Sequence, residues 1–206
     1  MNKNVLVFDG NPIYHSNSGF KLSKEEMMVI NGMEMIDCTD ELSLVSKSKD
    51  ILENEGLKNV KNFFNEQAQH YIDNILEIKI GARLTDSWVT IQKKGGSHHP
   101  HWHTNALLSI VYYPQIKDGN IYFFTPKSKI EKETNLGFEI INENIFNSPS
   151  TELTLNQNDI VIFPGWLQHG VRKNKSEGYR ISIASNYWIK GKFRACGILQ
   201  MMTARS

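Results

Sequence analysis

The stretch HHPHWHTNALLSIVYYP, residues 98–114, places four histidines within six positions and then enters an apolar segment rich in β-branched residues and tyrosine. An apolar run of that composition predicts a buried strand. The histidines ahead of it are either a metal site or a polar loop, because imidazole is the commonest metal ligand and is also frequent at protein surfaces. Residues elsewhere in the chain are needed to distinguish a metal site from a polar loop.

The chain after residue 82 consists of short β-branched or aromatic segments, most of them bounded by Gly, Pro, Asn or Asp. That texture predicts strands joined by turns, and Asp118-Gly119-Asn120 predicts a hairpin turn between two of them. Strands do not alternate with helices, which favours an antiparallel sandwich or barrel. The predicted strands are 88–91, 107–113, 120–125, 152–155, 160–163 and 180–188.

The chain before residue 82 has a helical period instead. Ser23-Lys24-Glu25-Glu26 predicts a capping box at a helix start. Apolar residues at three- and four-residue spacing predict an amphipathic helix over about 58–78. We therefore expect a mainly β protein with N-terminal helices, which is an α+β fold.

Length and composition predict one domain, since 206 residues with 40% hydrophobic content suffice for a single core. Within 1–206 we expect a helical part over about 1–82, the β core over about 83–190 and a tail over 191–206. Residues 127–150 are rich in Lys, Glu and Asn. We expect them to form a long polar loop, either a lid over the core or a surface insertion.

Charge and apolar patterning make several partners unexpected. Lys and Arg number 23 and Asp and Glu 22, without long runs of either sign, so neither nucleic acid nor an anionic membrane is an expected partner. No stretch approaches the roughly 18 apolar residues of a membrane span. We expect a soluble cytoplasmic protein that acts on a small-molecule or peptidyl substrate. Cys38 and Cys196 are expected to be free thiols, although their pairing stays open.

Alternation along the first motif defines the metal question. In a strand, the three odd-numbered histidines would share one face and His98 would lie on the other. A His-x-His pair supplies two imidazoles to one metal, and a third ligand must come from elsewhere. Both His99 with His101 and His101 with His103 have this spacing. His169, after a strand and a Pro-Gly turn, is the other histidine of the β half and the candidate third ligand.

A candidate anion site lies at the start of the last predicted strand. Alternation there places Arg180, Ser182, Ala184 and Asn186 on one face. An arginine fork beside a hydroxyl is suited to a buried carboxylate. In isolation, an arginine solvated or ion-paired at a strand end is an equally good interpretation. The candidate ligand His169 just upstream favours the buried carboxylate site.

These residues together carry a family resemblance. Four motifs occur in order: His101-x-His103, the strand ending in Tyr112-Tyr113, Phe163-Pro164 followed by His169, and Arg180-x-Ser182. Over about 84–188 the chain resembles the Fe(II)/2-oxoglutarate-dependent oxygenases. In particular, it resembles the small 2-oxoglutarate-Fe(II) oxygenases of bacteria and phages that are related to prolyl 4-hydroxylases.

The resemblance implies a double-stranded β-helix core, a cupin-like jelly roll, with Fe(II) and the cosubstrate 2-oxoglutarate bound inside it. Carried over by position, the metal ligands would be His101, His103 and His169. The cosubstrate residues would be Arg180, which holds the distal carboxylate, and its neighbours Ser182, Tyr113 and Asn186. The implied activity is that of a dioxygenase which hydroxylates an unidentified substrate and releases succinate and CO2.

Two other functions stay open at this point. Most of the superfamily has an acidic residue where His103 stands, and three imidazoles leave the metal's charge unreduced and also suit zinc. A three-His cupin-like metalloenzyme, such as a thiol dioxygenase or a zinc lyase or hydrolase, is therefore the second hypothesis. A non-catalytic jelly-roll binding protein is the third.

Several further residues are assigned structural roles. Asp118 and Asp159 are predicted to bond the backbone of their own turns. We expect Trp88 to serve packing, and His15 and His70 to be structural or solvated. The aromatic residues near predicted strand ends either line a substrate approach or pack in the core and rim; they are Trp102, Trp166, Trp188 and Phe163.

Overall fold

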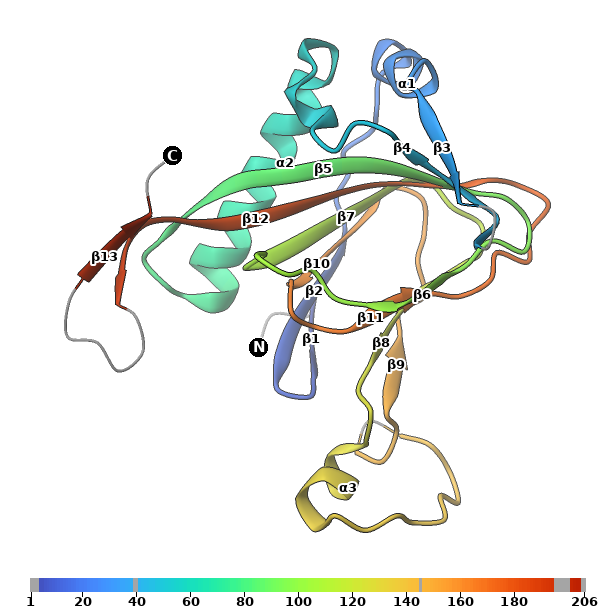
Figure 1. Cartoon of the computed structure of the whole chain (residues 1–206), viewed down its shortest axis with the longest axis vertical. Coiled ribbons are helices and arrows are strands. Elements are labelled where there is room, and N and C mark those ends of the chain that lie inside the picture. Colours follow the sequence, from blue (N-terminus) through green and yellow to red (C-terminus); the bar gives the residue numbers. More distant parts are fainter. Residues whose placement is uncertain (1–3, 39–40, 145, 195–200, 205–206) are drawn as a thin grey trace.

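Two antiparallel sheets form the frame of the protein in the computed structural model, which describes residues 4–38, 41–144, 146–194 and 201–204 (Figure 1). The first strands are β1 (Val5–Phe8), β2 (Asn11–Asn17), β3 (Met35–Cys38), β4 (Ser43–Ser46) and β5 (Gly81–Gln92). The later strands are β6 (His98–His101), β7 (Leu108–Gln115), β8 (Ile121–Phe124), β9 (Ser150–Glu152), β10 (Asp159–Pro164), β11 (His169–Val171), β12 (Arg180–Arg194) and β13 (Met201–Ala204).

The main sheet has the strand order β1-β2-β10-β7-β12-β5-β4-β3, and β13 pairs with the far end of β12. The small sheet has the order β6-β11-β8-β9. Neighbouring strands are antiparallel in both sheets. The mainly β, antiparallel architecture predicted from the turn-bounded apolar segments is therefore confirmed, and it consists of two sheets. The segment predicted as a strand over 152–155 is displaced, because β9 ends at Glu152.

The first two helices lie on one side of this frame (Figure 1), and the first begins at a capping box. In α1 (Lys24–Asn31), the Ser23 hydroxyl accepts the Glu26 N–H and the Glu26 carboxylate accepts the Ser23 N–H, as the capping box predicted. The predicted second helix is α2 (Lys58–Tyr71), prolonged by a π-helical turn over Ile72–Leu76. The shorter elements are α3 (Lys129–Thr134) and the 3-10 turns Ile51–Glu53 and Glu55–Leu57. No helix among the described residues is long and apolar enough to cross a membrane.

The N-terminal part is less helical than the sequence indicated. β1 and β2 extend the main sheet beyond β10, and β3 and β4 extend it beyond β5. These segments lack a strong period of their own, and they become strands because they satisfy the exposed edge groups of the core strands. The predicted tail over 191–206 is also partly sheet, since β12 continues to Arg194. Cys196 lies outside the described residues.

Alternating residues of the central strands divide the interior into two cores. Tyr112 belongs to the core between α2 and the main sheet, whereas Tyr113 belongs to the core between the two sheets. β10 behaves in the same way, with Ile162 toward the helix and Phe163 toward the small sheet. The helix covers one face of the main sheet, and the small sheet lies on the other side (Figure 1). Any site between the sheets is therefore shielded from the helical side.

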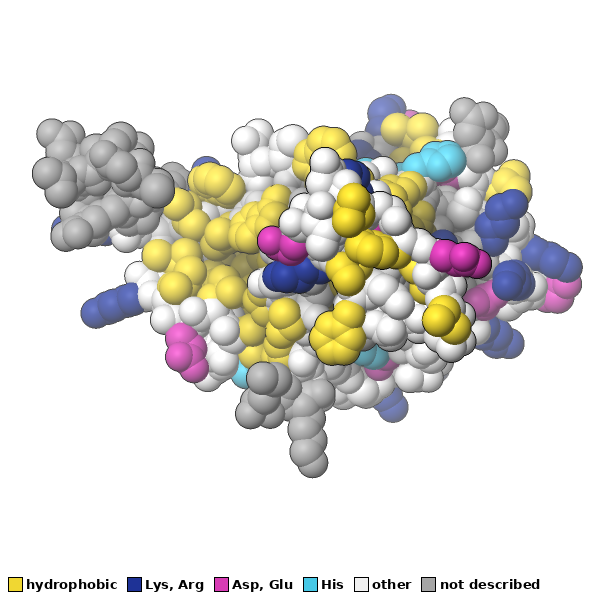
Figure 2. All heavy atoms as spheres, turned by 90° about the horizontal axis from the view of Figure 1, so that it is seen from below, with side chains coloured by type: hydrophobic (Ala, Val, Ile, Leu, Met, Phe, Trp, Pro, Cys, Tyr) yellow, Lys and Arg dark blue, Asp and Glu magenta, His cyan; other side chains and the backbone are white. Residues whose placement is uncertain are grey.

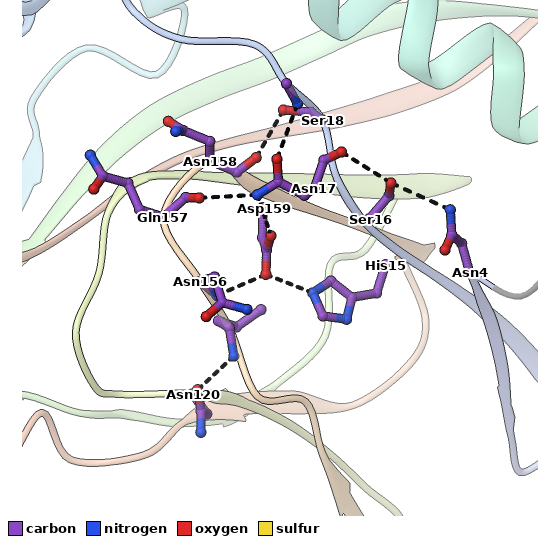
Figure 3. Close-up of polar contacts among 12 residues, drawn as sticks. Asn4, His15, Ser16, Asn17, Ser18, Asn120, Asn156, Gln157, Asn158 and Asp159 are labelled. Atoms are coloured by element: carbon purple, nitrogen blue, oxygen red, sulfur yellow. Dashed lines mark hydrogen bonds and ion pairs between the residues drawn. The ribbon is translucent and has the colours of Figure 1, made fainter.

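A buried carboxylate ties the N-terminal strands to the core (Figure 3). Asp159 is 2% exposed. Its oxygens accept the Asn156 N–H at 2.8 Å and the Asn17 side-chain amide at 3.0 Å, and they lie 2.9 Å from His15 Nε2. The predicted turn role of Asp159 is confirmed by the first contact. The other two contacts hold β2 against β10, so His15 has a structural role.

Asp159→Asn is expected to lower the free energy of unfolding by about 1–3 kcal/mol, because the new amide group turns a donor toward groups that now donate to the carboxylate. Urea denaturation followed by far-UV circular dichroism measures the change. The matched control is Asp73→Asn, an exposed carboxylate on the π-helical turn. Equal stabilities of the two variants would contradict the assigned role of Asp159.

Candidate active site

A cavity of about 450 Å³ lies between the two sheets. The register of β5, β12 and β7 arranges its main-sheet wall in cross-strand rows. At one end is the Arg180 row, made of Gln92 and Arg180. The next row along the wall is made of Thr90 and Ser182. Next comes the Trp88 row, made of Trp88, Ala184 and Val111. At the other end is the Asp86 row, made of Asp86, Asn186 and Ser109.

Three histidines converge on this cavity from the small sheet. The nitrogens of His101, His103 and His169 that could bind a metal all lie within 4.8 Å of one another. His101 ends β6 and pairs directly with His169 at the start of β11. His103 follows β6, and its backbone N–H donates to the Gly165 carbonyl at 2.8 Å. Two distant segments thus supply the three imidazoles that the sequence predicted as a set.

Hydrogen bonds fix the tautomers of two of these rings. The Nδ1 atoms of His101 and His169 each lie 2.9 Å from a backbone carbonyl, those of His99 and Leu167. A carbonyl only accepts, so each Nδ1 carries the proton and each Nε2 keeps a free lone pair. Metal-binding histidines usually make such a hydrogen bond from the ring nitrogen that does not bind the metal.

The environment also keeps the three rings neutral. Burial holds the pKa of His169 well below its usual range and lowers that of His103 to about 4. Burial lowers the pKa of His101 as well. Phe163 contributes to this apolar setting, with its ring centroid 4.5 Å from that of His169. Neutral imidazole is the form that binds metal, so the cluster is ready for an ion at neutral pH.

His99, the alternative ligand, is exposed and lies outside the cluster. His98 lines the cavity instead, where its Nδ1 contacts the Glu41 carboxylate. The cause is a bulge: His101 pairs with His169 and His98 with Val171, so three steps along β6 oppose two along β11. Strict alternation of side chains over 98–103 therefore assigned His98 and His99 to the wrong faces of the strand. The inserted step includes Pro100, which has no N–H to donate.

Arg180 is buried without an acidic partner among the described residues. Its Nη1 donates to Gln92 Oε1 at 2.8 Å and to Ser182 Oγ at 3.2 Å, and its Nε has no hydrogen-bond partner there. The Tyr113 hydroxyl is also buried without a hydrogen-bond partner, and its ring centroid lies 5.0 Å from Arg180 Cζ. A buried charge and two unused donors are costly unless a ligand compensates them. The arrangement fits a carboxylate.

Burial raises the pKa of Tyr113 to about 12, although the charge of Arg180 acts in the opposite direction. The phenol is therefore protonated at neutral pH and able to donate to an anion. Ser182, Tyr113 and Arg180, predicted together from sequence, lie together in the structure. Gln92, which orients the guanidinium, was not predicted.

Asn186 does not join them. It lies six residues from Arg180 on an extended strand, which is about 20 Å. Its side-chain oxygen accepts from Ser109 Oγ at 2.7 Å, and its nitrogen donates to Asp86 Oδ1 at 2.7 Å. The shared strand face suggested one site for Arg180 and Asn186, but the length of the strand separates them into the two ends of the cavity.

Trp88, predicted to serve packing, lines the cavity, and its ring centroid lies 5.5 Å from that of His103. Sequence reasoning also missed Asp86 and Glu41. Asp86 had a detectable signal, because Asp86, Trp88, Thr90 and Gln92 alternate along one strand. Glu41 had none, since its role depends on the approach of the loop after β3 to His98.

The other aromatic candidates lie away from the cavity wall. Phe163 is a core residue. Trp102 and Trp166 are each 57% exposed, and the indole N–H of Trp166 donates to Asn11. Trp188, which is partly buried, does not line the cavity either.

The 127–150 segment projects from the small sheet as α3 and a long loop (Figure 1). None of its described residues lines the cavity, so a lid position is not observed. The surface of the segment is also less polar than its composition indicated, because it exposes large hydrophobic side chains. Ile141 is 93% exposed and Leu136 is 60% exposed. Figure 2, seen from this side, shows hydrophobic side chains among the charged ones on the molecular face.

Three neutral imidazoles and a buried arginine without an acidic partner among the described residues share one cavity, and this combination suits a metal ion and an acidic ligand. Comparison with known families agrees. Residues 86–186 match the family described as "Putative 2OG-Fe(II) oxygenase". This match supports the 2-oxoglutarate-Fe(II) oxygenase superfamily for the β core of the chain. A search among curated proteins finds no match.

Solved structures share the fold at low sequence identity. An oxidoreductase of the 2OG-Fe(II) oxygenase family from Burkholderia pseudomallei is 9% identical with a TM-score of 0.56, over 79% of this chain and 75% of that one. HygX from Streptomyces hygroscopicus, solved with nickel and 2-oxoglutarate, is 12% identical with a TM-score of 0.59, over 85% and 82%. The 2-oxoglutarate-dependent epimerase SnoN from nogalamycin biosynthesis is 12% identical with a TM-score of 0.58, over 91% and 80%.

Proposed function

We propose that the protein is a hydroxylating dioxygenase in which His101, His103 and His169 hold Fe(II). Arg180, Ser182 and Tyr113 bind the distal carboxylate of 2-oxoglutarate. The observation that carries this proposal is the buried guanidinium of Arg180, which has no acidic partner among the described residues and shares a cavity with the three imidazoles. We also propose that the two sheets form a double-stranded β-helix within a single domain.

The donor set fits a metal that takes part in a reaction. Three protein ligands would leave the metal accessible to a further ligand, whereas a structural zinc site is usually closed by four. With both groups bound, the chemistry supplied is oxidative decarboxylation of 2-oxoglutarate to succinate and CO2, coupled to hydroxylation of a substrate C–H bond. The relatives include an epimerase, so the superfamily alone does not specify hydroxylation.

The chain's own residues supply position and a dry environment. Gln92 and Ser182 hold the guanidinium of Arg180 in one orientation, which removes the entropy cost of ordering it at each binding event. Apolar side chains on both sheets, including Val111, Ile121 and Val171, limit water around the site. The carbonyls that bond His101 and His169 keep each Nε2 available as a ligand.

The test is an anaerobic titration of metal-free protein with Fe(II) and then 2-oxoglutarate. A visible charge-transfer band that requires both additions is expected, because it reports a 2-oxo acid chelated to iron. Tight zinc binding without the band would favour the three-His cupin-like metalloenzyme. Absence of any bound metal would favour the non-catalytic binding protein.

Tyr113→Phe separates a ligand-binding hydroxyl from a structural one. The hydroxyl has no partner in the described structure, so its removal should leave the stability of the free protein unchanged or raise it by up to about 1 kcal/mol. The same change should weaken 2-oxoglutarate binding about 10- to 100-fold, because one hydrogen bond to a charged group is worth about 1.5–3 kcal/mol. Thermal unfolding and the titration above measure the two effects. Lower stability with unchanged affinity would refute this role of Tyr113.

A further inference from the structure

The Asp86 row lies at the end of the cavity opposite Arg180. The Ser109 hydroxyl donates to the oxygen of Asn186, and the nitrogen of Asn186 donates to Asp86, so a chain of hydrogen bonds orients the row. Ser109 and Asn186 are buried, whereas Asp86 is half-buried. The row therefore presents a fixed carboxylate to the cavity. Asp86 forms no ion pair within the described part of the chain.

A lysine approaches the same end of the cavity. The Lys49 carbonyl accepts the Ser87 N–H at 2.6 Å, which places the Lys49 backbone beside the strand that carries Asp86. The Lys49 side chain lines the cavity, and its Nζ donates to the Ser46 carbonyl at 3.2 Å. Partial burial lowers the pKa of this amine, while the neighbouring Cys38 and Asp86 act against that effect. Among the described residues, no carboxylate forms a salt bridge with Lys49.

Two opposite charges thus face one space without pairing with each other. Each would gain most from a ligand that carries the complementary charges, because charge-assisted hydrogen bonds are about twice as strong as neutral ones. A ligand with a single charge would satisfy one group and face repulsion from the other. The complementary ligand is a zwitterion.

The position of this pair relative to the histidines points to a substrate. Trp88, one row away from Asp86, contacts His103. Adjacent rows on one face of a strand are about 7 Å apart. A group held by Asp86 would therefore leave a short side chain within reach of the three-His cluster. A cavity of about 450 Å³ lies within the usual range for small-ligand sites.

We propose that the substrate is a free α-amino acid, whose ammonium group is bound by Asp86 and whose carboxylate is bound by Lys49. The side chain then extends past Trp88 toward His103, where it is hydroxylated. This assignment rests on the proposed oxygenase function. It adds the chemical class of the substrate and separates the substrate end of the cavity from the cosubstrate end at Arg180.

The test is calorimetric titration of the anaerobic Fe(II) and 2-oxoglutarate-loaded protein with each of the standard L-amino acids, and with the N-acetyl and carboxamide forms of any that bind. At least one free amino acid is expected to bind, and either modification should weaken it at least about 10-fold, the loss of one charged contact. Binding of no amino acid, or equal binding of an N-acetylated form, would overturn the proposal.

Variants locate the site. Asp86→Asn keeps an acceptor for Asn186 but loses the charge, and Lys49→Met keeps the length of the side chain. Each should weaken the amino acid at least about 10-fold while the charge-transfer band with 2-oxoglutarate stays unchanged. The matched controls are the variants Asp73→Asn and Lys47→Met, which change exposed residues. Unchanged amino-acid affinity in Lys49→Met, an exposed position whose replacement should not prevent folding, would overturn the proposal independently of Asp86→Asn.

Calorimetric titration of the metal-free protein with amino acids, compared with the charge-transfer experiment, separates this proposal from the oxygenase function. Amino-acid binding that depends on Asp86 and Lys49, in a protein that never gives the charge-transfer band, would retain the site and reject the oxygenase. A normal band without amino-acid binding would reject the site alone.

Discussion

His169→Ala is expected to abolish stoichiometric Fe(II) binding. His169 is the proposed ligand from the second segment of the chain, and it is 4% exposed with a single tautomer set by the Leu167 carbonyl. Loss of an outer-shell partner alone costs about 10–100-fold in metal affinity, so loss of a ligand should cost more than about 100-fold. Metal content after anaerobic loading and desalting measures the effect.

The control for this experiment is His99→Ala. His99 belongs to the same histidine-rich stretch, has the His-x-His spacing to His101, and is exposed outside the cluster. Its replacement should leave metal content at the wild-type value. Equal metal loss in the two variants, or full metal content in His169→Ala, would show that the ion is bound elsewhere.

Arg180→Ala is expected to weaken 2-oxoglutarate binding by about two to three orders of magnitude. Truncation of one partner of a buried hydrogen-bonded charge pair costs about 2–5 kcal/mol, and about 1.4 kcal/mol corresponds to tenfold. The loss should be specific to the cosubstrate, because Arg180 does not contact the three histidines in the structure. Titration of the charge-transfer band at fixed Fe(II) measures it.

Two comparisons sharpen this result. Arg172→Ala is the matched control, since Arg172 is exposed, lies over the Tyr122 ring and pairs with Glu152. Arg180→Met, which fills the same space without a charge, should make the ligand-free protein more stable, because an uncompensated buried charge is removed. A variant with normal 2-oxoglutarate affinity, or a less stable Arg180→Met protein, would contradict a binding role for this arginine.

Local rules predicted the elements that depend on neighbouring residues. The capping box at Ser23 and the helix over Lys58–Tyr71 follow from short-range contacts, and the structure contains both. The apolar strands β7 and β10 follow from composition and turn residues. The same rules missed the strands before residue 50, because their hydrogen bonds come from partners far along the chain.

The candidate site shows the same division. The family resemblance pointed to His101, His103 and His169, and to Arg180 with Ser182 and Tyr113. Alternation then failed at two places for geometric reasons. A bulge in β6 placed His98 rather than His99 at the cavity, and the length of β12 separated Asn186 from Arg180. Function in the cytoplasm stays a prediction from composition.

The sequence by itself determined the mainly β class, the superfamily resemblance and the set of histidines, since these depend on residue type, period and order along the chain. Only the tertiary structure decided which groups share one space. The pairing of β6 with β11 and of β5 with β12 brings together residues about 70 to 110 positions apart. It leaves Arg180, Asp86 and Lys49 facing a cavity without ion-pair partners in the described chain. Register and burial are properties of long-range contacts, so no local pattern contains them.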